Sequence, residues 1–423
     1  MHSFKAVLAL ALCATGTLGG AQTAVPQKLT LDEAVRLARQ SNTAVLAKQA
    51  QLAAAEGERS QAASPFFNNP AVSLEQARRS APGAPGTTER TLGVTQQFEI
   101  AGQQGHRRAA AAAALQAVTA ELDDARRQAG AEAAVRFYAV LAAQRRVELE
   151  QRAADLFERT SQAVARRRAA GEDTRLDANV AVIEAERARN ALTRAREQVV
   201  ESSTELAATL QLPPSALPQL SGALAPPPAT RPAYTVDQLV AGALALPRQA
   251  ALAARLDAAR ARLALARASR LPDVTLGVSR GREGPPDARE RVNTFTVSVP
   301  LPIFQRNQAA VGQGITEVSQ AEVERTAAAR DAEAQVRRLW QRLQLQGERV
   351  ERLQRSVLAA ATDNQQLASR SRQAGQIGLL QQLIVNRQAL DAERELIDAL
   401  ADWQATRIEL ESAAGWPLEG TSQ

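Results

Sequence analysis

The sequence predicts a mainly α-helical, elongated protein with a small β part, and three observations point to this class. Hydrophobic residues make up 45% of the chain but aromatic residues only 3%, which is typical of Ala- and Leu-rich helices rather than of a dense globular core. Residues 103–168 and 306–372 contain no proline, so each segment can form one very long helix. The length of 423 residues also exceeds that of one compact domain, which favours an extended body.

An internal repeat divides the chain into two similar halves. The pattern at 69–74 returns at 271–276, and the pattern at 168–171 returns at 372–375, in the same order. We therefore expect a signal peptide at 1–21, a first repeat at 22–212, a Pro-rich linker at 213–232, a second repeat at 233–415 and a C-terminal tail at 416–423.

Each half is expected to contain a helix, a hairpin of two strands, a very long helix, a turn and a return helix. Thr30 and Glu33 have the capping-box spacing for a first helix that runs to about Ser64, and Thr235 repeats the cap. Alternating apolar residues predict the strands, and polar segments rich in Pro and Gly predict the loops between them. The expected strands lie at about 70–80, 88–100, 272–280 and 291–301, and the return helices at about 174–212 and 378–413.

The long helices carry a heptad pattern of apolar residues. Val336, Leu343, Val350 and Val357 lie seven residues apart, which is the spacing of helices packed as a coiled coil. At 1.5 Å per residue, each long helix would measure roughly 100 Å. The first helix and the return helix of each half are shorter, so we expect them to lie end to end along the long one.

The first residues are typical of a secretory signal peptide. An apolar run reaches Cys13, and Gly19 and Ala21 form a small-residue cleavage site before Gln22. Cleavage and lipidation at Cys13 is the less favoured alternative, because Leu12 is too large for that site. The protein is therefore expected to be exported.

The residue types exclude several kinds of function. Cys13 is the only cysteine, and His2 and His106 are the only histidines, so processing would leave one histidine and no thiol. We therefore expect neither an enzyme nor a cofactor or metal site. The net charge of +6 comes from arginines interleaved with acids along the helices, which argues against a nucleic-acid partner.

The strands predict an oligomer that inserts in lipid. Four strands per chain cannot close a membrane barrel, whose smallest form has about eight, and an open edge in lipid would leave backbone groups unpaired. Two chains would give a barrel filled by side chains, whereas three chains would supply twelve strands and leave a lumen. We therefore expect a homotrimer whose long helices extend the barrel into a tube.

Several motifs resemble those of the TolC-type outer-membrane channels, and within them the cobalt-zinc-cadmium branch of heavy-metal efflux. They include the segments at 272–276, 297–304 and 306–308, the segment at 98–102, and the Ala-Gly turns at 170–171 and 374–375. The resemblance covers nearly the whole mature chain. It implies a homotrimer with a twelve-stranded outer-membrane barrel and a periplasmic α-helical tunnel, which receives heavy-metal cations from an inner-membrane RND-type pump through a periplasmic adaptor.

The two Ala-Gly turns are expected to form the periplasmic tip of the tunnel. Gly171 and Gly375 would end the long helices, and we expect them, with Arg168 and Arg372, to dock the adaptor. Relatives often carry acids after the second turn, but this chain has Gln376 and Gln381 there. The acids follow the first turn, where Asp173 and Asp177, four residues apart, would share one helical face and either cap the return helix or ring the pore. The pore candidates at the tip are Glu172, Asp173, Asp177, Gln376 and Gln381.

Two other functions remain open from the sequence. The same kind of outer-membrane channel could serve drug or small-molecule efflux or protein secretion, because no residue pattern identifies the cargo. A different class, an exported coiled-coil structural protein of the periplasm, would explain the helices. It would not explain why amphipathic strands interrupt both halves at matching places.

Overall fold

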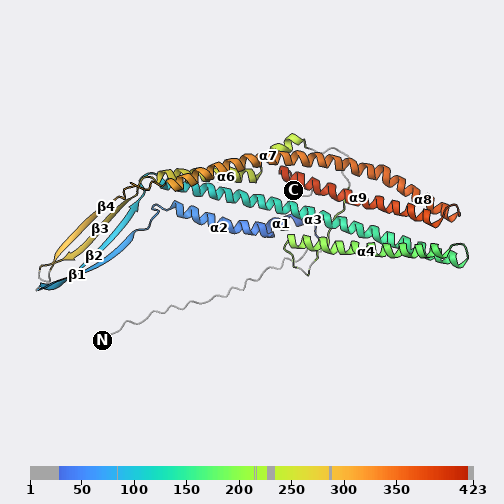
Figure 1. Cartoon of the computed structure of the whole chain (residues 1–423), viewed down its shortest axis with the longest axis horizontal. Coiled ribbons are helices and arrows are strands. Elements are labelled where there is room, and N and C mark those ends of the chain that lie inside the picture. The colour runs from blue at the N-terminus through green and yellow to red at the C-terminus, as the bar shows by residue number, and fades with distance from the viewer. Residues whose placement is uncertain are drawn as a thin grey trace, which may run out of the picture.

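The computed structural model describes residues 28–82, 84–213, 215, 217–225, 234–284 and 288–417. The expected signal peptide, parts of the Pro-rich linker and most of the C-terminal tail lie outside these residues. The chain is elongated, with a four-stranded sheet at one end and helices that continue from it to the opposite end (Figure 1). The fold is therefore mainly α with a small β part, as the composition predicted.

The two halves have the same order of elements. The first half consists of α1 (Leu31–Ser41), α2 (Thr43–Ala63), β1 (Ala71–Ala81), β2 (Ala84–Phe98), α3 (Gln103–Ala169) and α4 (Arg175–Thr209). The second half consists of α5 (Val236–Leu244), α6 (Pro247–Ala268), β3 (Val274–Glu283), β4 (Glu290–Ser298), α7 (Gln308–Arg352), a π-helical segment η1 (Leu353–Leu358), α8 (Ala359–Gln373) and α9 (Leu379–Ala414).

The first helix has the predicted cap but not the predicted length. The Thr30 hydroxyl accepts from the Glu33 amide at 3.3 Å, and the Thr30 amide donates to the Glu33 carboxylate at 3.0 Å, which completes a capping box. The expected single helix to Ser64 is wrong, because Asn42 adopts an extended backbone between α1 and α2. Its side-chain oxygen accepts from the Ala44 amide at 2.9 Å and so begins α2 as a new helix.

The long helix of the first half is continuous, whereas that of the second half contains a π-helical segment. α3 has 67 residues and a length of about 100 Å. Between α7 and α8, η1 widens the helix by one residue per turn, which rotates every later side chain about the axis. Val336, Leu343 and Val350 are therefore buried as the heptad predicted, but Val357 is 43% exposed and leaves the seam.

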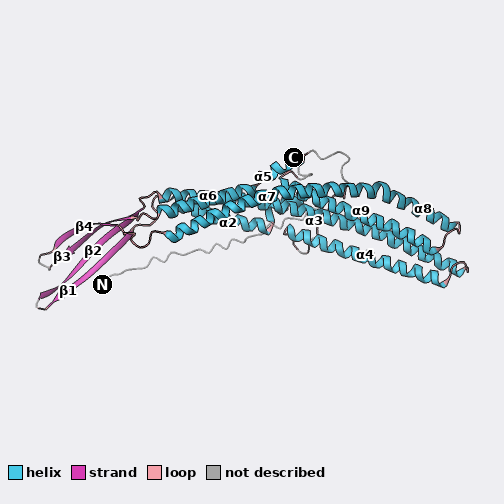
Figure 2. Cartoon of the chain, turned by 45° about the horizontal axis from the view of Figure 1, so that its top comes forward, coloured by secondary structure: helices cyan, strands magenta, loops and turns pink. Residues whose placement is uncertain are grey.

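Shorter helices lie end to end along the long ones. α3 contacts α2 towards the sheet and α4 towards the opposite end, and α7 contacts α6 and α9 (Figure 2). α3 also packs against α6 and α9, so the two halves share one helical body. Its core contains mostly small and aliphatic side chains, and the α9 residues Leu383, Leu390 and Ile397, spaced seven apart, are all buried.

The sheet joins the halves through its central strands. Its order is β1-β2-β3-β4, all antiparallel, and Val94 of β2 lies opposite Val278 of β3. The hairpins extend further than the sequence indicated, since β2 begins at Ala84 rather than at 88 and β3 continues to Glu283. Backbone pairing continues there into the segment that the sequence predicted as a loop, as in the pair Arg79 and Thr87.

None of the helices among the described residues combines the length and the apolar character that a bilayer-spanning helix requires.

Candidate functional site

Two glycine turns form the end of the helical body that lies furthest from the sheet (Figure 1). Gly171 has φ +83° and Gly375 has φ +72°, a left-handed conformation that glycine adopts without strain. The Glu172 amide donates to the Arg167 carbonyl at 2.9 Å, and the Gln376 amide donates to the Ser371 carbonyl at 2.8 Å. Both turns therefore end their helices in the same way, with the last carbonyls of the helix satisfied.

A buried ion pair connects the two turns. Both oxygens of the Asp173 carboxylate accept from Arg372 Nη2, at 2.9 and 3.0 Å. Arg167 Nε also donates to this carboxylate, at 3.2 Å, and the Asp173 side chain is only 5% exposed. Arg372 in addition donates to the Ile377 carbonyl at 3.3 Å. This ion pair therefore connects the tip of the first half to the tip of the second half.

Asp177 has a separate role as a helix cap. Its amide donates to the Thr174 hydroxyl at 3.1 Å, and its carboxylate accepts from the Thr174 amide at 3.1 Å and from the Thr174 hydroxyl at 2.6 Å. These hydrogen bonds lower the pKa of the Asp177 carboxyl below its ordinary value, and the Arg372 charge lowers it further. Asp177 therefore stabilises the first turn of α4.

The expectation that Asp173 and Asp177 share a helical face is wrong. Asp173 precedes Thr174, the N-cap of α4, and therefore lies outside that helix. The other candidates at the tip differ in how far their side chains are exposed to solvent. The side chain of Arg372 is largely covered because it pairs with Asp173. The exposed candidates at the tip are Arg168, Glu172, Gln376 and Gln381.

Two buried carboxylates, Glu150 and Glu184, and the partly buried Glu121 join α3 and α4 to helices of the same or the other half. Glu150 on α3 is 3% exposed at its side chain and accepts from Arg394 on α9 at 2.9 and 2.6 Å. Glu184 on α4 accepts from Arg387 on α9 at 2.8 Å. Glu121 on α3 accepts from helices of both halves, from Lys48 on α2 and from Arg255 on α6, each at 2.7 Å.

The sequence alone assigned no role to these three acids. The local signals were the spacing of four residues between Arg146 and Glu150 and of three residues between Glu184 and Arg187, and both pairs form at 3.1 Å. The decisive partner Arg394 lies 244 residues away, so no spacing rule could have identified it.

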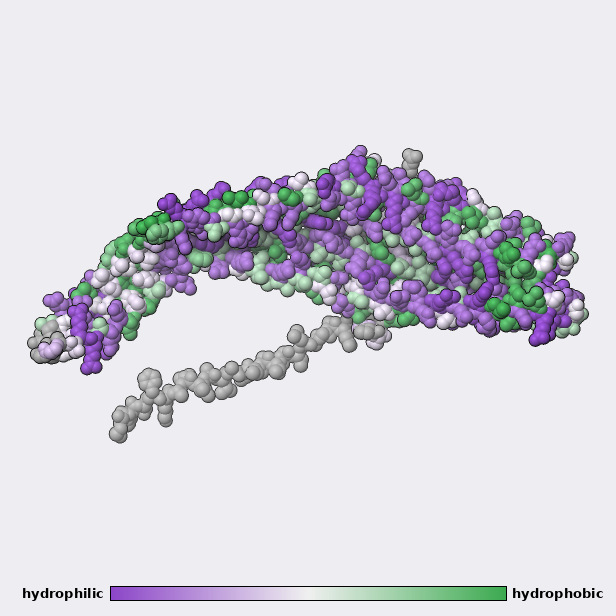
Figure 3. Space-filling view, viewed as in Figure 1, coloured by the Kyte–Doolittle hydropathy of each residue, from purple (hydrophilic) through white to green (hydrophobic). Residues whose placement is uncertain are grey.

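The sheet has two different faces. On one face, which we call the crowded face, a Cβ added to Gly93 would lie 2.8 Å from Ser73 Oγ, and one added to Gly281 would lie 2.7 Å from Thr91 Oγ1. Small residues therefore leave little free space between the strands on this face. The opposite face, which we call the apolar face, exposes aliphatic and aromatic side chains over the strands (Figure 3). They are Val72, Leu74, Leu92, Val94, Val278, Phe295 and Val297.

All acids of the described strands lie on the crowded face. The register pairs Glu75 with Thr91 and Thr91 with Gly281, and it pairs Glu283 with Glu290. Glu89 shares this face and accepts from Arg79 at 3.1 Å. The sequence could have predicted this shared face, because apolar and polar residues alternate along each strand and every acid occupies one of the polar positions.

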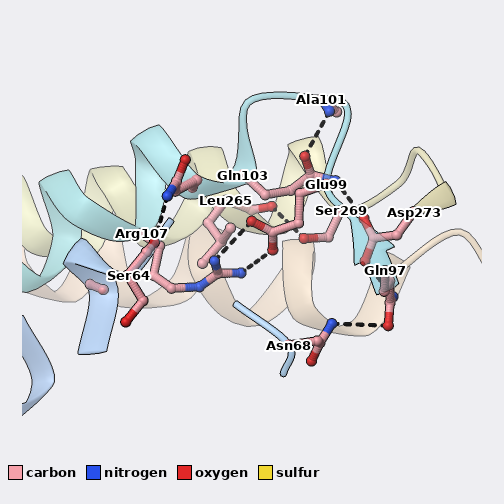
Figure 4. A network of polar contacts seen from close by, with 12 residues as sticks. Ser64, Asn68, Gln97, Glu99, Ala101, Gln103, Arg107, Leu265, Ser269 and Asp273 are labelled. Atoms are coloured by element: carbon pink, nitrogen blue, oxygen red, sulfur yellow. Dashed lines mark hydrogen bonds and ion pairs between the residues drawn. The ribbon is translucent and has the colours of Figure 1, made fainter. Parts of the chain in front are cut away.

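A network of polar contacts fixes the junction between sheet and helices (Figure 4). Asp273 accepts from Gln97 Nε2 at 2.7 Å and from Gln103 Nε2 at 3.1 Å. Gln97 Oε1 in turn accepts from Asn68 at 2.9 Å, and Gln103 Oε1 accepts from the Ala101 amide at 2.7 Å. Asp273 belongs to the second half and the other residues to the first, so this network holds both hairpins at one angle to the helices.

The described part of the chain contains no group of three or more His, Cys, Asp or Glu side chains arranged to hold a metal ion. His106 lies in the first turns of α3, next to Arg107, which pairs with Glu99 and stacks on Phe67 at 3.7 Å from the ring centre. Among the described residues, the most buried acids thus connect helices, and the acids of the strands line one face of the sheet.

A four-stranded sheet that continues into a long helical body with glycine tips defines a class of membrane efflux channels. The chain matches the model of the outer membrane efflux protein family over residues 34–210 and 246–416, and it belongs to that family. It is an outer-membrane efflux channel with a periplasmic helical tunnel. The resemblance that the sequence motifs indicated is thereby confirmed.

The chain is similar to proteins of known function and structure. It is 30% identical to the cobalt-zinc-cadmium resistance protein CzcC of Cupriavidus metallidurans over 309 residues, which are 70% of this chain and 68% of CzcC. Its fold is similar to the crystal structure of CusC, with a TM-score of 0.78, 16% identity and 92% of each chain covered. The outer-membrane protein VceC of Vibrio cholerae gives a TM-score of 0.75 and 19% identity, over 92% of this chain and 97% of VceC.

Proposed function

We propose that three copies of this chain form the exit duct of a tripartite efflux system whose cargo is heavy-metal cations. An inner-membrane RND-type pump and a periplasmic adaptor would deliver the cargo to the helical tunnel. The observation that carries the proposal is the gathering of Glu75, Glu89, Glu283 and Glu290 on the crowded face of the sheet. The identity to CzcC supports the same cargo.

The edges of the sheet support assembly from several copies. Within the described sheet, β1 and β4 each pair on one side only, and unpaired backbone groups are costly in lipid. Three copies joined edge to edge would pair both edges and close a barrel wide enough for a lumen. The crowded face, which carries the acids, would then line the lumen, and the apolar face would contact lipid.

The charge of the crowded face supports cations as cargo. In a trimer each acid would occur three times around the lumen. The positive charge of Arg79 would offset only the negative charge of Glu89, with which it pairs. A unit charge at about 10 Å contributes roughly 0.4 kcal/mol even in water, so a group of such charges enriches cations in a narrow pore. Asp173 contributes less at the tip because two arginines surround it.

The tip residues support docking of the adaptor. Arg168, Glu172, Gln376 and Gln381 are exposed there, beside turns that the Asp173 and Arg372 pair holds together. An exposed polar surface on a firmly held turn suits a second protein that must bind and release.

Single-channel recordings test the cation preference. We expect the purified channel in a planar bilayer to show a cation-selective reversal potential under a KCl gradient. Glu75→Gln with Glu283→Gln should shift the reversal potential towards zero, whereas Glu197→Gln, an exposed acid on α4, should shift it much less. An anion-selective channel, or equal effects of both changes, would reject the role of the crowded face.

Growth assays test the cargo. Cells that lack their own exporters are supplied with this channel, its pump and its adaptor, and are challenged with zinc, cobalt or cadmium salts and with neutral antibiotics. Protection against the metals is expected. Protection against the antibiotics alone would instead support export of small molecules.

A further inference from the structure

We propose that the loop end of the apolar face binds the phosphate groups of lipid headgroups in the outer leaflet of the outer membrane. This surface is separate from the path of the cargo, because it lies on the opposite face of the sheet from the acids. The arginines that form it are Arg78, Arg90, Arg280, Arg282 and Arg291.

The strand register places three of these arginines in one row. Arg90 of β2 lies opposite Arg282 of β3, and Arg282 lies opposite Arg291 of β4. Directly opposite side chains have Cβ atoms about 5 Å apart, and like charges in such pairs destabilise a sheet. A row of this kind is favourable when an anion from outside the sheet binds between the guanidinium groups.

The described residues supply no such anion. Every acid of the described strands points to the crowded face, and no described carboxylate lies within 4.0 Å of these arginines. Arg90 donates only to an amide oxygen, that of Gln76, at 3.1 Å. In contrast, Arg79 on the crowded face has its own partner in Glu89.

The row lies where the apolar band of the sheet ends. On the same face and closer to the helices are Val94 and Val278, which are 48% and 62% exposed. In Figure 3 the surface over the strands carries hydrophobic and weakly polar residues, and strongly hydrophilic residues gather towards the loop end. An arginine at such a boundary can lay its carbon chain along apolar surface and keep its charge at the level of the headgroups.

The position and the chemistry identify the partner. The helical body is periplasmic, so the loop end of the sheet faces the cell exterior and meets the outer leaflet. Guanidinium groups bind phosphate oxygens through paired charge-assisted hydrogen bonds. Phosphorylated lipid headgroups supply this anion at the edge of the apolar band.

Another copy of the chain cannot take this place. A neighbouring copy could reach β1 or β4, which are the edges of the sheet, but Arg90 and Arg282 lie on β2 and β3. Each of these inner strands is flanked by strands of its own sheet on both sides. Only a molecule that covers the apolar face itself can contact the two inner arginines together.

Binding of labelled lipopolysaccharide to the full-length protein in neutral detergent tests the proposal. The probes are the phosphorylated lipid and the same lipid after enzymatic dephosphorylation. We expect the phosphorylated probe to bind at least about tenfold more tightly, since charge-assisted hydrogen bonds of this kind contribute on that order. The preference should disappear in the double variant R90Q/R282Q and be reduced in the single variant R90Q, whereas it should persist in R79Q, which removes one arginine charge from the crowded face.

Further measurements separate a folding defect from a loss of binding. The variant R90K/R282K keeps the charge and should retain part of the preference, and each variant is checked for helical content and oligomer size. Equal binding of the two probes, or an unchanged preference in R90Q/R282Q, would overturn the proposal. Export is not measured, so a failure here leaves the proposed channel function untouched.

Discussion

Asp173 and Arg372 make the contact that joins the two tips of the chain. The side chains of Asp173 and Arg372 are 5% and 15% exposed, so little water reaches the pair. Removal of one partner from such a pair leaves a charged group without its main hydrogen bonds, which costs more than the pair itself contributes. The same argument applies to Glu150 between α3 and α9.

Arg372→Ala should lower the stability of the tip by about 1–3 kcal/mol, because the Asp173 carboxylate then keeps only Arg167 as a partner. The matched control is Arg168→Ala, since Arg168 occupies the equivalent position before the other glycine and is exposed. Limited proteolysis at the tip and thermal unfolding in detergent measure the difference. Equal losses in both variants would contradict the role assigned to the pair.

Glu150 should make the joining of α3 to α9 dependent on pH. Burial raises the pKa of its carboxyl, but hydrogen bonds from Arg394 and the charges of Arg394 and Arg146 lower it more, so the pKa lies below its ordinary value. A pKa depressed in the folded state stabilises the protein above the unfolded-state pKa of about 4.3 and loses this effect as the pH falls through the folded-state value.

We therefore expect Glu150→Gln to lower the unfolding temperature at pH 7 and to lower it progressively less as the pH falls below about 4.3. Glu148→Gln is the control, because Glu148 pairs with Arg145 at the surface, where both side chains are more than half exposed. Thermal melts across this pH range provide the measurement. A loss that is independent of pH would assign Glu150 a role in packing alone.

At the scale of the elements, the helices show where a regular pattern is interrupted. The π-helical segment η1 shifts the faces of α8 relative to those of α7, and Leu353 is buried while Val357 is not. The glycine turns interrupt the helices in another way, because their left-handed backbone reverses the chain. A Cβ at Gly171 or Gly375 would meet no atom within 4 Å, so only the backbone conformation requires glycine there.

Gly375→Ala should therefore destabilise the tip by about 1 kcal/mol, through the left-handed backbone alone. Gly312 gives a control with the opposite sign. It lies inside α7, where a Cβ would also meet no atom within 4 Å, so Gly312→Ala should stabilise the helix by about 0.5–1 kcal/mol. Chemical unfolding of both variants tests these signs, and a neutral Gly375→Ala would show that the turn can change its conformation freely.

At the scale of the whole molecule, the sheet and the helical body suit different surroundings. The apolar face exposes aliphatic and aromatic side chains, while the exposed surface of the helices carries many ion pairs. The junction network around Asp273 holds the two parts at one angle. A single copy leaves the edges of β1 and β4 unpaired within the described sheet.

The native mass of the protein in detergent should correspond to three chains, because three copies pair all the edges and leave a lumen. Native mass spectrometry measures this directly, and single-particle images should show threefold symmetry. A stable monomer or dimer with full helical content would contradict the proposed assembly.

The secondary structure was predictable because it depends on residues close together in the chain. Thr30 with Glu33, the spacing of Leu383, Leu390 and Ile397, and the alternation in the strands are patterns of two to seven residues. The break at Asn42 and the segment η1 were not predictable, because an asparagine cap competes with helix continuation and a π-helical turn leaves no distinctive pattern. The internal repeat located the two tip turns, but it did not predict the ion pair of Asp173 and Arg372 that connects them.

By itself, the sequence determined most of the helices, the strands and the caps, since periodicity and turn residues act locally, and its motifs resembled those of one family of channels. Only the tertiary structure decided which charges meet. Asp173 and Arg372 are 199 residues apart in the chain, and Arg90 faces Arg282 only because β2 and β3 pair in one particular register. Contacts between distant segments depend on how the two halves pack, and the interactions that set this packing are spread over the whole length of α3.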